Sequence, residues 1–280
     1  YEITTRLVGS EMCIRDRDMK ERIALFFDID GTLFDSKTKS ILPKTIEMLE
    51  ELKKHDNYDL YLSTGRSHQT LGTLSNFISY FKGLNLSNGQ EIYLDNQLIY
   101  ENEIDKEDLK QMLTLGEEKK YPLGMITNHE VEMNFFNEES YLNFTNYIKA
   151  EVKNLNHEPF DTNKKVLQIW MFASNEEIDQ TIPLFPNLCF LKWGGYGADI
   201  IPKGASKAKG VQIIQTIMGY KKENMYAFGD GDNDALMFTI VGTSVAMGNA
   251  SDLAKEMADF VTDDIDNEGL YRAVKRLNLI

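Results

Sequence analysis

Short apolar runs alternate with amphipathic segments in the first third of the chain and again in the last third. Residues 23–29 (IALFFDI) and 58–65 (YDLYLSTG) are apolar runs of strand length. Segments with helical periodicity follow them, at residues 42–55 and 67–81. Residues 206–277 repeat this rhythm, with three more apolar runs and four more helical segments. Because strands joined through helices pair in parallel, the alternation predicts an α/β fold with a parallel sheet.

The middle of the chain has a different pattern. From residue 88 to residue 195, short strand candidates are mixed with amphipathic segments such as 138–155, and LDNQ at residues 94–97 is typical of a hairpin turn. The length of 280 residues also exceeds the usual size of one domain. We therefore expect an open parallel-sheet, Rossmann-like core built from residues 19–87 and 196–280. An α+β domain would be inserted at residues 88–195.

The first residues of the chain resemble translated adapter sequence. The stretch GSEMCIRDR at residues 9–17 can be encoded by the transposase end sequence that is used to prepare sequencing libraries. We therefore expect residues 1–18 to be a non-native leader and the natural chain to begin at Met19. A natural N-terminal tail is the alternative, and it would leave the functional interpretation unchanged.

Charge and cysteine content restrict the classes of partner. The chain carries 44 acidic residues against 30 Lys and Arg residues, so its net charge is −14 at pH 7. This charge argues against binding to nucleic acid or to an anionic membrane surface. No apolar run reaches the length of about 18 residues that crosses a bilayer. The two cysteines, Cys13 and Cys189, cannot form a disulfide framework, so we expect a reducing, cytoplasmic location.

Residues that can bind a cation and a phosphate follow the predicted strands. Asp28 and Asp30 follow the first strand, Thr64 follows the second, and residues 230–234 (DGDND) follow a later one. Lys207, in KGASK, stands at the start of a predicted helix. These residues should converge, because sites in open parallel sheets form at the carboxyl ends of the strands. Carboxylate oxygens suit Mg²⁺, and a lysine and a hydroxyl can hold phosphoryl oxygens.

Each of these motifs has a simpler interpretation when it is taken alone. A single D-x-D-G is usually a turn, and a sequence such as STGR is usually a strand end followed by a helix cap. Alternating acids also begin calcium-binding loops, but such a loop needs Gly at its sixth position and Glu at its twelfth. Counted from Asp230, these positions hold Ala235 and Val241, which argues against calcium. The functional interpretation therefore depends on all the motifs together.

Four motifs in a fixed order resemble those of a known family. DIDGT (28–32), Thr64, Lys207 and GDGDND (229–234) are similar to the motifs of the haloacid dehalogenase superfamily of phosphohydrolases. The insertion after SNG and the ending that contains VAMGNA resemble the Cof-type subfamily, whose large α/β cap lies between the second and third motifs. The similarity spans residues 23–280. It implies that the inserted domain is a cap that contributes to substrate specificity.

The resemblance also implies a role for each motif residue. Asp28 would be the nucleophile that forms an aspartyl-phosphate, and Asp30 would be the general acid and then the general base. Thr64 and Lys207 would hold the phosphoryl oxygens. The Mg²⁺ site, to which Asp30 would contribute its main-chain carbonyl, would consist of Asp28, Asp30, Asp230 and Asp234. The residues closest to the substrate would be Gly31, Gly65, Arg66, Asn88, Gly89 and Asn233.

These roles predict a Mg²⁺-dependent phosphatase that acts on a small phosphorylated metabolite, such as a sugar phosphate or a phosphorylated cofactor. A phosphomutase or phosphotransferase with the same aspartyl-phosphate is the alternative among enzymes. A non-catalytic phosphometabolite-binding protein is the alternative outside enzymes. Such a protein should lack Asp28 or Asp30, but both residues are present. In the cap, Trp193 and Tyr196 could line a substrate mouth or belong to the core of the domain.

Overall fold

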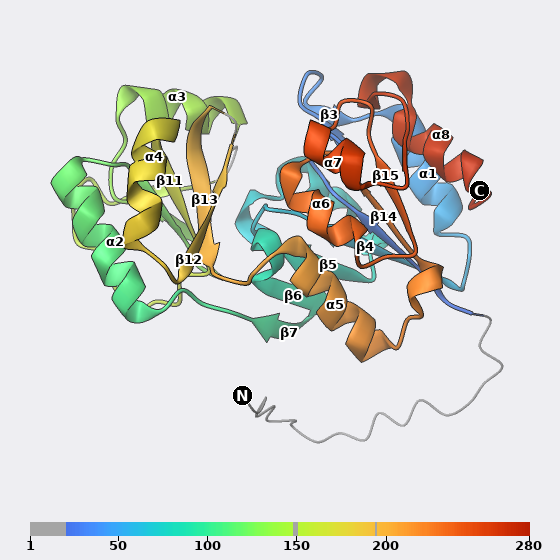
Figure 1. Ribbon diagram of the computed structural model, residues 1–280, viewed down its shortest axis with the longest axis horizontal. Coiled ribbons are helices and arrows are strands. Elements are labelled where there is room, and N and C mark those ends of the chain that lie inside the picture. Colours follow the sequence, from blue (N-terminus) through green and yellow to red (C-terminus); the bar gives the residue numbers. More distant parts are fainter. Residues whose placement is uncertain (1–20, 148–150, 194) are drawn as a thin grey trace.

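Figure 1 shows two α/β units that lie side by side. The computed structural model describes residues 21–147, 151–193 and 195–280. The larger unit is built from both ends of this described chain, and the smaller unit is built from its middle. The expected leader at residues 1–18 lies outside the described residues and stays a prediction.

The larger unit, the core, contains an eight-stranded sheet. From one edge to the other, its strands are β16 (Phe260–Val261), β15 (Thr243–Ala246), β14 (Met225–Gly229), β1 (Ile23–Phe27), β4 (Tyr58–Ser63), β5 (Gly83–Leu86), β6 (Glu91–Leu94) and β7 (Gln97–Glu101). The strands from β16 to β5 are parallel, and β6 and β7 add an antiparallel hairpin. A separate small hairpin consists of β2 (Phe34–Asp35) and β3 (Ser40–Ile41). The predicted α/β fold with a parallel-sheet core is confirmed.

Helices cover both faces of the core sheet. One face carries α1 (Pro43–Leu52) and α8 (Gly269–Arg276), and the other carries α5 (Lys207–Met218), α6 (Asp232–Phe238) and α7 (Asp252–Met257) (Figure 1). Right-handed crossovers produce this arrangement, because connections that run toward opposite edges of a sheet lie on opposite faces. With both faces covered, residues 24–27 of β1 are fully buried, which explains why this strand is a continuous apolar run.

The smaller unit, the cap, contains a six-stranded sheet. From edge to edge, its strands are β10 (Lys153–Asn154), β9 (Val131–Met133), β8 (Leu123–Ile126), β11 (Gln168–Ser174), β13 (Tyr196–Pro202) and β12 (Leu188–Lys192), and its helices are α2 (Lys106–Lys119), α3 (Glu138–Tyr147) and α4 (Asn175–Thr181). Leu109 of α2 and Ile178 of α4 pack on one face of the sheet, while Phe144 of α3 packs with Trp170 and Phe172 on the other. Across the described residues, none of the helices has both the length and the apolar character required to span a membrane.

The limits of the cap differ from the predicted 88–195. Residues 94–97 do form a hairpin turn, with positive φ angles of 47° at Asp95 and 62° at Asn96, but the hairpin extends the core sheet. At the other end, β13 pairs with β11 and β12 in the cap sheet. The chain therefore leaves the core after Glu101 and returns to it after Pro202. Local periodicity could not show this, because the choice of sheet depends on distant pairing partners.

Two predicted helices also take a different form. Residues 67–81 contain the 3₁₀ segments η1 (His68–Thr70) and η2 (Gly72–Tyr80) in place of an α-helix. Gly72 has a φ of +57°, which interrupts right-handed helical backbone. The predicted helix at 138–155 is observed as α3, and Lys153 and Asn154 form β10 instead. Residues 148–150 of this prediction lie outside the described residues.

Candidate active site

The predicted site residues meet at the point where the strand order of the core sheet reverses. β1 and β14 are neighbours in the middle of the sheet, and the connections that follow them lead toward opposite edges. Asp28 directly follows β1, Thr64 directly follows β4, and Asp230 directly follows β14. Because these strands are parallel, the three residues share one edge of the sheet, where ligands bind in open α/β folds.

Lys207 links two of the predicted carboxylates. It is the first residue of α5, after the N-cap Ser206, and its side chain is 1% exposed. Its Nζ donates to Asp28 Oδ1 at 2.6 Å and to Asp234 Oδ1 at 2.7 Å. The other oxygen of Asp234 accepts the backbone N–H groups of Asp230 and Gly231 at 3.0 and 2.9 Å. A buried lysine and the start of α6 therefore fix the carboxylates in place.

The negative charge of the clustered carboxylates exceeds the positive charge that the protein itself places beside them. Burial raises the pKa of Asp28 well above its usual value, and Asp234 and Asp230 add to this against the opposing charge of Lys207. Burial, together with the charge of Asp234, raises the pKa of Asp230 to about 7. Burial alone would lower the pKa of Lys207, but Asp234 and Asp28 outweigh it and raise that pKa. The cluster thus favours the gain of a further positive charge.

The acidic cluster fits a divalent cation. Asp28, Asp230 and Asp234 each offer an oxygen atom, and these atoms lie within 4.8 Å of one another. Thr32 Oγ1 donates to Asp230 Oδ1 at 3.1 Å and so orients that carboxylate. Oxygen ligands of this type match the preference of Mg²⁺. The Asp30 side chain points elsewhere, so only the predicted contribution of its main-chain carbonyl remains open.

Asp30 lies at the rim of the cluster and is paired with Arg66. The Asp30 side chain is 54% exposed, and it accepts two bonds from Arg66, from Nε at 2.8 Å and from Nη2 at 2.5 Å. The Nη1 group of Arg66 donates to the carbonyl oxygens of Thr70 and Leu71, so the guanidinium is held from two sides. Arg66 was predicted to bind substrate, and the structure shows it orienting the predicted acid and base.

The loops after β1 and β4 are shaped by close backbone approaches. Gly31 has a φ of +81°, and a Cβ atom at this position would come within 2.1 Å of Asp230 Oδ2. Only glycine can therefore occupy this turn beside the Asp230 carboxylate. Thr64 is 1% exposed, its Oγ1 accepts the N–H of Arg66 at 3.1 Å, and its carbonyl accepts the N–H of Asn88 at 3.0 Å.

Asn88 connects the core site to the cap. Asn233 Nδ2, from the start of α6, donates to Asn88 Oδ1 at 3.0 Å. Asn88 Nδ2 in turn donates to Oδ2 of Asp199 in β13 at 3.2 Å, and Gln168 Nε2 in β11 donates to the other oxygen at 2.7 Å. Gly89, next to Asn88, packs against the Ser206 carbonyl that precedes Lys207. The predicted Asn88 and Asn233 thus contact each other, while Asp199 and Gln168 are additions from the structure.

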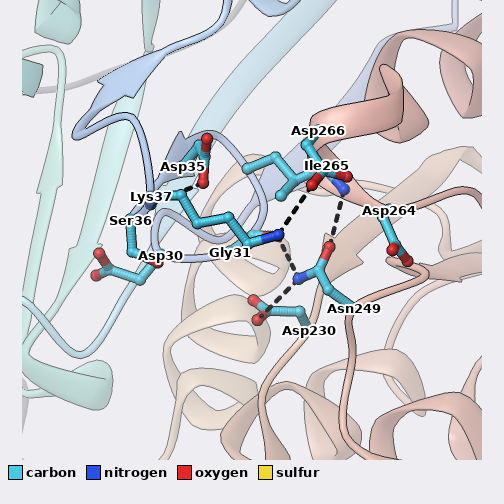
Figure 2. Close-up of a pocket in the computed structure, with 10 residues that line it drawn as sticks. All are labelled: Asp30, Gly31, Asp35, Ser36, Lys37, Asp230, Asn249, Asp264, Ile265 and Asp266. Carbon is cyan, nitrogen blue, oxygen red and sulfur yellow. Dashed lines mark hydrogen bonds and ion pairs between the residues drawn. The ribbon is translucent and has the colours of Figure 1, made fainter.

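Figure 2 shows a further residue that the sequence reasoning did not select, Asn249. It lines a cavity of about 290 Å³ beside Asp230. Its Nδ2 donates to the Gly31 carbonyl at 2.9 Å and approaches Asp230 Oδ2 at 3.4 Å, and its Oδ1 accepts the N–H of Ile265 at 2.9 Å. Asn249 therefore holds the Gly31 turn beside the Asp230 carboxylate. Its signal in the sequence is its place in VAMGNA, within the predicted strand at residues 243–250.

One family profile matches most of the chain. The family is described as haloacid dehalogenase-like hydrolase, and the match covers residues 25–274. The chain therefore belongs to the haloacid dehalogenase-like hydrolases. The resemblance that the four motifs indicated is confirmed.

Individual relatives agree with this assignment. A Bacillus subtilis protein named "Putative phosphatase YkrA" is 32% identical over 263 residues, which cover 91% of this chain and 98% of that protein. The 5-amino-6-(5-phospho-D-ribitylamino)uracil phosphatase YcsE of the same species is 26% identical over 265 residues, 94% of this chain and 98% of that protein. The structure of the HAD subclass IIB sugar phosphatase BT4131 matches with a TM-score of 0.85 and 32% identity, over 92% of this chain and 100% of that chain. The chain is thus a phosphatase with a Cof-type cap.

Proposed function

We propose that this chain is a Mg²⁺-dependent phosphatase that hydrolyses small phosphorylated metabolites through an aspartyl-phosphate on Asp28. The observation that carries the proposal is the buried Asp28 carboxylate, bonded to Lys207 and grouped with Asp230 and Asp234. A carboxylate can attack an anionic phosphoryl group only where positive charge offsets the repulsion. Bound Mg²⁺ would be held by Asp28, Asp230 and Asp234 and would supply the part of this charge that Lys207 does not.

In the first step, a carboxylate oxygen of Asp28 attacks phosphorus, and the bond between phosphorus and the ester oxygen breaks. Lys207 and Thr64 hold phosphoryl oxygens that do not react. Asp30, in its protonated form, gives its proton to the ester oxygen, and a neutral alcohol leaves. The negative charge of the phosphoryl group stays within the cluster throughout, so the fixed position of Lys207 serves each stage.

In the second step, water replaces the alcohol. Asp30, now a carboxylate, takes a proton from the water molecule. The oxygen of that water molecule attacks the phosphorus of the aspartyl-phosphate at the same time. The bond between Asp28 and phosphorus breaks, inorganic phosphate leaves, and Asp30 is protonated again. The pair of bonds from Arg66 keeps Asp30 at the rim, where the alcohol and the water would enter. One residue can therefore serve both proton transfers.

The proposed substrates are sugar phosphates or phosphorylated cofactor precursors. Two relatives support this range, since one is named a sugar phosphatase and the other acts, by its name, on a phosphorylated ribityl compound. Both names describe a small alcohol with several hydroxyl groups as the leaving group. The excess of acidic residues and the reducing environment that the cysteine content suggests further support a small metabolite in the cytoplasm.

Phosphate release from p-nitrophenyl phosphate, with Mg²⁺ or with EDTA, tests the proposal. We expect turnover that needs the metal, that is lost in Asp28→Asn, and that persists in Asp179→Asn, a matched change at an exposed cap residue. Turnover in ¹⁸O-labelled water should place the label in the released phosphate, as hydrolysis requires. Wild-type activity of Asp28→Asn would disprove the nucleophile, and transfer to added glycerol in preference to water would indicate a phosphotransferase.

A further inference from the structure

Asn85 is a fully buried polar residue of the core that belongs to none of the four motifs. It lies in β5 and pairs in register with Ser63 of β4, so the two side chains project to the same face of the sheet. The helix α5 packs on this face (Figure 1). Asn85 Nδ2 donates to Ser63 Oγ and to the Lys207 carbonyl, each at 2.9 Å. Asn85 therefore joins the strand that leads to Thr64 and the helix that begins at Lys207.

Asn85 contacts both residues that are expected to hold the phosphoryl oxygens. Its carbonyl accepts the N–H of Thr64 at 2.9 Å, while its side chain holds the first carbonyl of α5, that of Lys207. Thr64 and Lys207 come from different elements, so their separation depends on where α5 lies on the sheet. Apolar packing is non-directional, whereas a hydrogen bond constrains both distance and angle. The bonds of Asn85 therefore fix the start of α5 relative to the end of β4.

The fit of α5 over Asn85 requires a glycine in the first turn of the helix. Gly210 lies opposite the amide, and a Cβ atom at this position would be 2.0 Å from Asn85 Oδ1 and 2.6 Å from Asn85 Nδ2. Asn85 Oδ1 has no hydrogen-bond partner among the described residues. An unpaired buried oxygen is unfavourable, and an apolar side chain of the same size would lack it. What the amide supplies in return is its two donor bonds beside the residues that are expected to hold phosphate.

We propose that Asn85 is a positioning residue that sets the separation of Thr64 and Lys207 and thereby the binding of the phosphoryl group. Asn85 acts through these two residues and does not touch the substrate. Without its bonds the start of α5 is free to shift on the sheet, and a displacement of about 1 Å can cost about a hundredfold in rate. Because the phosphoryl group is common to all substrates, the loss affects every ester alike. The inference rests on the proposed phosphatase function and adds a residue that positions its phosphate-binding groups.

The test measures phosphate binding and turnover in Asn85→Leu, which keeps the size of the side chain but removes its hydrogen bonds. Binding of inorganic phosphate to the Mg²⁺-loaded protein, followed by isothermal titration calorimetry, should weaken by about tenfold. The value of kcat/KM should fall by at least that factor for p-nitrophenyl phosphate and for glucose 6-phosphate alike. Tyr220→Phe is the matched control, because it removes buried hydrogen bonds to Asp59 and Tyr61 near the opposite end of β4. It should lower the unfolding temperature and leave phosphate binding unchanged.

Gly210→Ala provides a second test that retains the amide. The added Cβ atom would push Asn85 and α5 apart, so phosphate binding should weaken severalfold in the wild-type background. In an Asn85→Ala background the same change should cause no further loss, since the obstructing side chain is gone. Equal losses in both backgrounds, or phosphate binding by Asn85→Leu as tight as that by Tyr220→Phe, would overturn the positioning role. A wild type without Mg²⁺-dependent turnover of p-nitrophenyl phosphate would instead disprove the phosphatase itself.

Discussion

Two parts of the candidate site, the cluster around Lys207 and the junction with the cap, differ in how their polar groups are paired. In the cluster, Lys207 bonds to Asp28 and Asp234, and both oxygens of Asp234 are occupied. At the junction with the cap, buried atoms of Ser87, Gln90, Glu91 and Gln168 have no hydrogen-bond partner among the described residues. Unpaired buried groups are costly, at about 1–3 kcal/mol each, unless something else satisfies them.

This difference suits a division of roles, in which the core cluster carries out the reaction and the junction with the cap recognises the substrate. The phosphoryl group is the same in every substrate, so the groups that hold it can be fully preorganised by the core. The leaving group varies between substrates, and a second sheet, that of the cap, reaches this junction through the bond between Asn88 and Asp199. The core should therefore determine whether turnover occurs, and the junction should determine which ester is used. The variants below test this division, from the largest expected effect to the smallest.

Replacement of the nucleophile should have the largest effect. Asp28→Asn should lower kcat by at least about a thousandfold, because no covalent intermediate can form. The fold should remain, since the change removes one of three mutually repelling carboxylates while Lys207 keeps its bond to Asp234. Phosphate release and thermal unfolding measure the two effects. A large loss of stability would contradict the view that the cluster carries excess negative charge.

Loss of Lys207 should damage both rate and stability. Lys207→Met leaves Asp28 and Asp234 buried without their cation, so unfolding should become easier by about 3–5 kcal/mol. Turnover should fall by about a hundredfold or more, since a donor to the phosphoryl group is lost. Lys203→Met is the matched control, because Lys203 is exposed and donates to the Pro186 carbonyl. Equal effects of the two variants in denaturant and kinetic measurements would show that Lys203 shares the role.

The pairing of Arg66 with Asp30 should matter for proton transfer more than for stability. Arg66→Lys keeps the charge but loses the two-pronged contact, so kcat for an alkyl phosphate should fall by about tenfold. The loss should be smaller with p-nitrophenyl phosphate, because its leaving group needs no proton. Stability should change by less than about 1 kcal/mol, since Asp30 is 54% exposed. An equal loss for both substrates would mean that Arg66 acts on the phosphate instead.

Glu91, in the strand that follows Asn88, should have the smallest effect on turnover and should act only on stability. Burial raises its pKa from 4.5 to about 7, so between these values the native carboxyl group holds a proton that the unfolded one has lost. The free energy of unfolding should therefore fall as pH rises from 5 to 8. Glu91→Gln should remove this contribution, on the order of 1–3 kcal/mol, and become the more stable protein at pH 8. Denaturant unfolding at pH 5 and pH 8 measures this change in the free energy of unfolding, and Glu118→Gln, at an exposed residue, is the control. The prediction would be contradicted if the free energy of unfolding changed with pH in the same way for the wild type and for Glu91→Gln.

Much of the core could be predicted from the sequence because its signals are local. The apolar runs of β1, β4, β14 and β15 were recognised directly, and Asp28, Thr64 and Asp230 stand immediately after three of them. Once the strands are parallel, their ends must meet, so the site follows from the strand positions. The placement of Lys207 at a helix start followed from the same reasoning.

Other features were decided only by the tertiary structure. The sequence by itself determined the α/β class, the order of the motifs and the residues available for phosphoryl transfer, because strand periodicity and strand-end chemistry are encoded within a few residues. It did not determine that β6 and β7 join the core sheet and β13 the cap sheet, or that Arg66 pairs with Asp30. It also gave no sign that Asp199 would reach Asn88. Each of these depends on contacts between segments that are distant in the chain, which exist only after both sheets have formed.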